Sequence, residues 1–144
     1  MNDFKEMTTQ NHWLIKFAPF RTSWTEIVQR GTFTLRGVRS RVARKHLSSM
    51  RLGDQVLFYH SQQGLAIVGM MQVTREAYPD STSADPQWLT CDFTPLQTLP
   101  RPVTLAEIKA DSRLATLALL IQPRLAVMPV ASEQFQIIAE EVSR

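Results

Sequence analysis

Two apolar runs joined by a short polar segment constrain the fold of this chain more than any other feature. The first run, Val56 to Ser61, is apolar at consecutive positions, which is typical of a strand that is covered on both faces. The second run, Ala66 to Val73, contains Gly69, and a glycine inside a strand usually marks a bulge, a barrel corner or a close backbone approach. The pattern predicts a central hairpin in a small closed or half-closed barrel that carries helices.

The rest of the chain supplies the further elements of an α+β fold. Ser23 and Thr104 each begin a capping box, and Ser40 and Ser132 are suited to cap helices, which predicts helices over 24–30, 41–49, after 104 and after 132. Further strands are expected at 13–17, 32–35, 88–94 and 124–130. A chain of 144 residues with 44% apolar content is the size of one domain, which we place at 12–144, after a flexible tail at 1–11.

Several classes of protein are disfavoured by what the sequence lacks. No window approaches the roughly 18 consecutive apolar residues of a membrane span, and the N-terminus has no signal-peptide core, so we expect a soluble, cytoplasmic protein that does not bind membranes. Cys91 is the only cysteine, no His or Cys pair has metal-ligand spacing, and no glycine-rich phosphate loop is present. His60 and Ser61 are adjacent on a strand and point to opposite faces, so they cannot easily form a catalytic pair. We therefore expect no enzyme, no metal and no cofactor.

Positive charge is concentrated in one part of the chain. Seven basic residues and no acidic residue lie within 27–53, whereas the remainder carries nine basic and thirteen acidic residues. This distribution suits an anionic partner such as nucleic acid, although a solvated helix face is an equally simple explanation. The residues expected to contact phosphates are Arg36, Arg39, Arg41, Arg44 and Lys45.

Eight segments resemble one known family in their order along the chain. They are Trp13 to Lys16, Gly37 to Arg39, Ala43-Arg44, Val56 to Ser61, Ile67 to Gly69, Glu76 to Asp80, Pro102 to Lys109 and Arg124 to Val130. These segments are similar to the EVE domain, and the resemblance extends from about His12 to Ile138. It implies a PUA-like fold, a mixed β-barrel flanked by short helices and related to YTH domains. It also implies a non-enzymatic pocket for a modified base extruded from nucleic acid.

The resemblance places a ligand-binding pocket at the end of the first strand, the following basic loop and the central hairpin. Its residues are Lys16, Phe17, Leu35, Val38, Arg39, Ser40, Tyr59, His60 and Ser61. Three of them depart from the family pattern, because Phe17 stands for a serine, Leu35 for a stacking tryptophan and Ser40 for an edge-reading asparagine. The pocket therefore lacks one aromatic platform, and Phe17 is a candidate to replace it.

Two functions remain open from the sequence. The first is a reader of a modified base in nucleic acid, either DNA or RNA, with the basic residues on the phosphates. The alternative is a PUA-like domain whose more apolar pocket binds a different small ligand or a protein partner. The oligomeric state is open as well.

Overall fold

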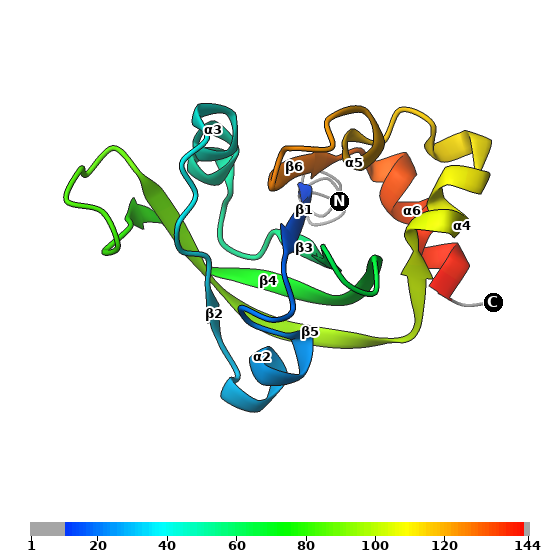
Figure 1. The fold of residues 1–144 in the computed structure, drawn as a ribbon, viewed down its shortest axis with the longest axis horizontal. Helices are drawn as coiled ribbons and strands as arrows, with labels where there is room; N and C mark the ends of the chain where they lie inside the picture. Colours follow the sequence, from blue (N-terminus) through cyan, green and yellow to red (C-terminus); the bar gives the residue numbers. More distant parts are fainter. Residues whose placement is uncertain (1–10, 143–144) are drawn as a thin grey trace, which may run out of the picture.

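A computed structural model describes residues 11–142 of the chain. Along the sequence the elements are β1 (His12–Phe17), α2 (Trp24–Arg30), β2 (Phe33–Thr34), α3 (Arg41–Ser49), β3 (Gln55–His60), β4 (Ala66–Pro79), β5 (Leu89–Thr104), α4 (Leu105–Ala110), the 3-10 turn η1 (Ser112–Leu114), α5 (Ala118–Ile121), β6 (Val127–Val130) and α6 (Ser132–Val142). Figure 1 shows α3 and α6 on one side of the β4–β5 ribbon and α2 on the other. The predicted flexible tail lies, apart from Asn11, outside the described residues.

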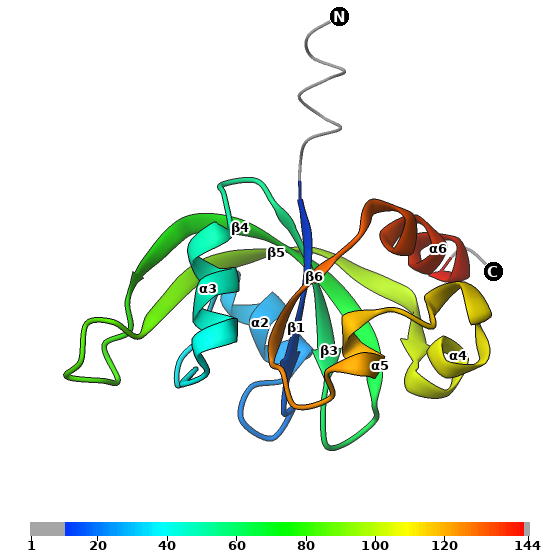
Figure 2. The same ribbon diagram turned by 90° about the horizontal axis from the view of Figure 1, so that it is seen from above.

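The strands form one mixed sheet in the order β2-β5-β4-β3-β1-β6. Strand β1 runs parallel to β3 and antiparallel to β6, and the other pairs are antiparallel. Figure 2 shows β1 between β3 and β6. The predicted hairpin, β3 with β4, lies at the centre, as expected. The sheet is not closed into the predicted barrel, because its edge strands β2 and β6 hold only two and four residues and do not pair with each other.

Three of the four predicted helix caps are confirmed; the fourth is wrong, because Ser132 is the first residue of α6 and not the residue that precedes it. The side chains of Ser23 and Thr104 accept from the backbone N–H groups of Glu26 and Glu107, which completes both capping boxes, and Ser40 caps α3. Strands β4 and β5 are longer than predicted, with fourteen and sixteen residues. Four shifts of register between them let β5 continue through its prolines, which a sequence pattern would treat as strand ends.

Gly69 makes the close approach that its position in the strand predicted. A Cβ atom added there would lie 2.2 Å from the indole of Trp24, so α2 packs its tryptophan directly on the backbone of β4. Around this contact the rings of Phe17, Phe33 and Phe58 pack at centroid distances of 5.3–6.4 Å. One cluster of buried apolar side chains extends from Trp13 to Ile138. The single domain that the sequence predicts over 12–144 stays a prediction. Among residues 11–142, none of the helices is long and apolar enough to span a membrane.

Candidate functional site

The end of β1 sends two neighbouring side chains to opposite faces of the sheet. The ammonium of Lys16 donates a hydrogen bond to the carbonyl oxygen of Pro123, in the segment before β6. Burial lowers the pKa of this lysine. Phe17 instead packs edge-on against Phe33, with ring centroids 5.3 Å apart. The structure therefore does not bring Phe17 to the side of the sheet that Lys16 faces.

A hollow of about 420 Å³ lies between the start of α3 and the segment that Lys16 contacts. We call it the α3 hollow, and its lining residues are Ser40, Val42, Gln122, Pro123, Arg124 and Leu125. The Ser40 hydroxyl accepts a hydrogen bond from the Ala43 N–H at 3.2 Å, which leaves its own proton available for an acceptor on a ligand. No aromatic ring is among these lining residues.

The rim of the α3 hollow favours an anionic group. Helix α3 has nine residues and no acidic side chain in its first turn, so its N-terminal N–H groups carry uncompensated partial positive charge. Arg41 lies in the first turn of α3, and Arg124 is one of the lining residues of the hollow. Both are exposed. These groups can hold a phosphate beside whatever enters the hollow.

Arg39, which the sequence assigns to both the pocket and the phosphates, is held by a buried carboxylate. Its guanidinium donates to Asp80 at 3.2 Å and to the hydroxyl of Thr82 at 3.0 Å. Asp80 also accepts from the Gly37 N–H at 2.8 Å. Burial alone would raise the pKa of Asp80, but the hydrogen bonds from Gly37, Thr82 and Arg39 outweigh it and lower the pKa to about 2. Arg39 thus fastens the basic loop to the β4–β5 connection.

The other predicted phosphate contacts are exposed or partly exposed. Arg44 donates to the side chain of Gln87 at 2.6 Å and lies 5.3 Å from the centre of the Trp88 ring. Arg36, Arg41 and Lys45 are exposed, and Arg36 lines a different hollow with Phe17. The basic residues therefore lie on the loop before α3 and on α3 itself.

The remaining predicted pocket residues are mainly structural in this arrangement. Leu35, Val38 and Tyr59 are buried in the core. The imidazole Nε2 of His60 accepts the backbone N–H of Trp24 at 3.1 Å, and the Ser61 N–H donates to the Phe17 carbonyl. Of the predicted set, Ser40 lines the α3 hollow, and Lys16 contacts one of its lining residues through the hydrogen bond to the Pro123 carbonyl.

Sequence reasoning missed the other side of the α3 hollow. Residues 122–125 lie more than eighty positions after Ser40, and no local pattern links the two segments. A signal was present, because Arg124 and Leu125 begin a segment that carries the EVE resemblance. That segment indicates a strand, whereas its first residues lie before β6 and line the α3 hollow.

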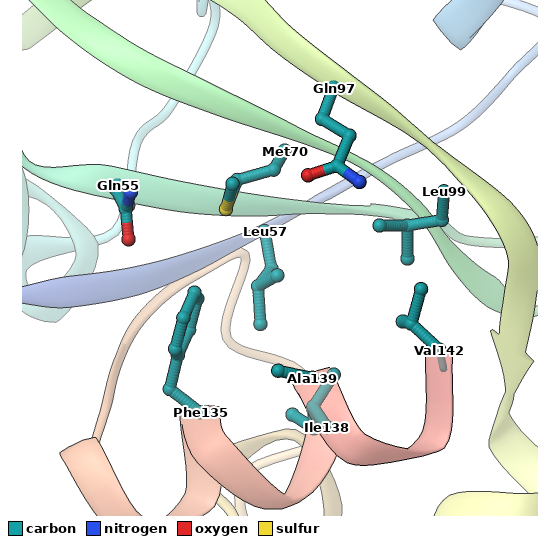
Figure 3. Close-up of a pocket in the computed structure, with 9 residues that line it drawn as sticks. All are labelled: Gln55, Leu57, Met70, Gln97, Leu99, Phe135, Ile138, Ala139 and Val142. Carbon is teal, nitrogen blue, oxygen red and sulfur yellow. The ribbon is translucent and has the colours of Figure 1, made fainter. Parts of the chain in front are cut away.

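A separate hollow of about 300 Å³ lies between α6 and the sheet. Figure 3 shows its apolar lining from α6 and from β3, β4 and β5, together with the amide side chains of Gln55 and Gln97. None of the sequence-predicted site residues lines it. Within the part of the chain that the structure describes, no three His, Cys, Asp or Glu side chains are placed to hold a metal ion.

The fold and comparisons with known proteins define the class of this protein. The architecture is that of PUA-like domains, and a YTH domain from Zygosaccharomyces rouxii shares the fold with a TM-score of 0.62 at 13% identity, over 93% of this chain and 87% of that one. The model of the EVE domain family matches residues 11–141. The chain belongs to the EVE domain family.

Individual relatives agree with this assignment. Mouse thymocyte nuclear protein 1 is 29% identical over 180 aligned residues, covering 95% of this chain and 80% of its own. The crystal structure of a protein from Agrobacterium tumefaciens has a TM-score of 0.90 and 35% identity, with 92% of each chain covered. Human THYN1, solved in complex with DNA containing 5-methylcytosine, has a TM-score of 0.86 and 25% identity, covering 94% of this chain and 99% of that one.

Proposed function

We propose that this protein is a non-enzymatic domain that binds nucleic acid through a modified base, with the base in the α3 hollow. The observation that carries the proposal is that Lys16, from β1, and Ser40, from the start of α3, meet at the same segment, 122–125. The human relative in complex with DNA containing 5-methylcytosine supports this choice of ligand.

The chemistry of the α3 hollow suits a base that has left its stack. The Ser40 hydroxyl and the Gln122 amide offer hydrogen bonds to a base edge, and Val42 and Leu125 offer apolar contact to a methyl group. Because no ring lines the hollow, one stacking contact is missing, which typically costs about 1–3 kcal/mol per base. We therefore expect weak but modification-dependent binding, with Arg41 and Arg124 among the phosphate contacts.

A second function is favoured by the same lining. Half of the six lining residues are apolar, and the stacking position of the family is filled by Leu35, which is buried in the core. Such a surface also suits a small apolar ligand or a protein partner. Salt separates the two functions, because nucleic-acid affinity falls steeply with ionic strength, whereas apolar contacts barely respond.

The proposed function is tested by titrating the protein with two DNA oligonucleotides that differ only in one 5-methylcytosine, at fixed salt. The wild type should prefer the methylated strand. Val42→Glu should reduce binding of both strands at least about tenfold, because it places a carboxylate at the mouth of the hollow, where phosphates approach. Val42 is 51% exposed and lies in the first turn of α3, where a glutamate stabilises the helix, so the variant should fold normally.

The matched control is Leu96→Glu, which adds the same charge at an exposed position of β5 outside the hollow. It should bind like the wild type. Equal loss in both variants, or binding that does not change with salt, would favour the second function instead. The predicted cytoplasmic location belongs to this proposal and stays a prediction. The name of the mouse and human relatives, thymocyte nuclear protein 1, indicates a different location for those proteins.

A further inference from the structure

A second polar hollow lies on the side of the sheet that Phe17 faces. It has a volume of about 360 Å³, and we call it the arginine hollow because Arg21, Arg30 and Arg36 line it. The rings of Phe17 and Phe33 also line it, together with threonine side chains. None of the lining residues is acidic. Three guanidinium groups around one hollow create a positive electrostatic potential that attracts an anion.

Two of these arginines, Arg21 and Arg36, form no ion pair within the described residues. Arg30 is 3.4 Å from Glu26, in an exposed pair one helical turn apart. Within residues 11–142, by contrast, no carboxylate lies within 4.0 Å of the guanidinium of Arg21 or Arg36. Asp92 is not a lining residue, but its carboxylate accepts a hydrogen bond from the hydroxyl of Thr34, which is one. The hollow therefore has a surplus of positive charge that the protein does not neutralise by itself.

The position of Arg21 is fixed by the protein. Its guanidinium lies 4.4 Å from the centre of the Phe17 ring and donates to the carbonyl oxygen of Arg36 at 3.4 Å. Gly37, with φ of 88°, lets the turn after Arg36 pass close by, and a Cβ atom there would be 3.5 Å from Arg21 Nη2. Because one face of the guanidinium is already held, less rotamer entropy is lost when its free N–H groups bind an anion.

We propose that the arginine hollow binds a phosphate of the strand whose base enters the α3 hollow. This inference rests on the proposed function. The basic loop connects the two sites, since Arg36 lines one and Ser40 lines the other. Arg36 and Ser40 are four positions apart, so their Cα atoms are at most about 14 Å apart at 3.6 Å per residue. Because the two hollows lie on opposite sides of the sheet, the strand would reach the arginine hollow by passing around the edge strand β2 and the loop that follows it.

The test is the salt dependence of binding of a short single-stranded DNA oligonucleotide with one 5-methylcytosine. Each phosphate contact on a single strand contributes about 0.7 to the slope of log affinity against log salt. Arg21→Gln with Arg36→Gln should lower the slope by about 0.7 and keep the preference for the methylated strand. The control, Arg75→Gln with Lys109→Gln, removes two exposed charges that line neither hollow and should leave the slope unchanged.

The outcomes separate this inference from the proposed function. An unchanged slope in Arg21→Gln with Arg36→Gln overturns the phosphate site, even if Val42→Glu still weakens binding of both strands. A reduced slope with no effect of Val42→Glu keeps the phosphate site and overturns the base hollow. If no oligonucleotide binds, titration with inorganic phosphate decides, monitored by the amide signals of Thr34 and Arg36. Shifts that only the wild type shows would assign the hollow to free phosphate rather than to a strand, and no shifts would remove the site.

Discussion

The guanidinium of Arg39 lies between the carboxylate of Asp80 and the hydroxyl of Thr82, forty or more residues further along the chain. In the sequence, Arg39 is one of several basic residues in a loop and is indistinguishable from Arg36. In the structure, Arg39 has a buried anionic partner, whereas no carboxylate pairs with Arg36 among the described residues. The role of a charged side chain thus depends on the residue that it pairs with. The sequence does not show that Arg39 pairs with Asp80.

His60 provides a prediction on pH dependence. Its Nε2 accepts the Trp24 N–H and must be unprotonated to do so, and burial lowers the pKa of the imidazole from its ordinary value of 6.5. Burial likewise lowers the pKa of His12 and His46. Because the unfolded chain takes up these protons before the folded chain does, stability should be full above pH 6.5 and fall as the pH decreases below it. Urea midpoints measured from about pH 8 to pH 5 check this decrease.

The contribution of His60 itself is isolated by His60→Gln, since the glutamine carbonyl can still accept from Trp24 but does not titrate. This variant should lose less stability than the wild type over the same pH range. A decrease as steep as that of the wild type would show that His60 is not among the groups responsible.

At the scale of elements, α2 is fastened to three strands through one residue. Trp24 packs its indole on Gly69 of β4, donates from Nε1 to Thr98 of β5 at 2.8 Å and donates its backbone N–H to His60 of β3. Helix α2 is only seven residues long and would be marginal alone, so these contacts hold it in place. Helix α2 carries Arg30, and the turn after β1 carries Arg21. Both segments therefore also shape the arginine hollow.

Gly69→Ala should therefore destabilise the fold by about 1–3 kcal/mol, as overpacking of a core does. The measurement is urea unfolding of the wild type, Gly69→Ala, Trp24→Leu and the double variant. The double variant should be less destabilised than the sum of the single variants, because the smaller leucine makes room for the added methyl group. Strict additivity would mean that the indole does not oppose a Cβ atom at position 69.

Local signals in the sequence were sufficient for the helices but not for the extent of the sheet. Ser23, Ser40 and Thr104 announce helix starts because a cap involves only the next few residues. The ends of β4 and β5 depend on pairing between strands, with shifted register around Pro95, and were placed too early. For the same reason the sequence indicates only Ser40 among the lining residues of the α3 hollow, since residues 122–125 are distant in the chain, and the binding role of the predicted pocket residues stays a prediction.

At the scale of the whole molecule, one buried cluster extends from β1 to α6. A single core predicts that residues 12–144 unfold as one cooperative unit. Urea transitions followed by tryptophan fluorescence and by far-ultraviolet circular dichroism should superimpose, because the three tryptophans report on different regions: Trp13 lies in β1, Trp24 in α2 and Trp88 directly before β5. Two separate midpoints would show that the chain contains two units.

The place of β1 in the sheet has a consequence for protein synthesis. Strand β1 is synthesised before the other described strands, yet one of its edges is covered only by β6, which is made more than a hundred residues later. Until then the nascent chain exposes an unpaired strand edge, the kind of surface that other chains can pair with. The α3 hollow has the same dependence, since 122–125 precede β6. The hollow therefore exists only after residues 122–125 have been translated, and nascent chains that stop short of this point cannot form it.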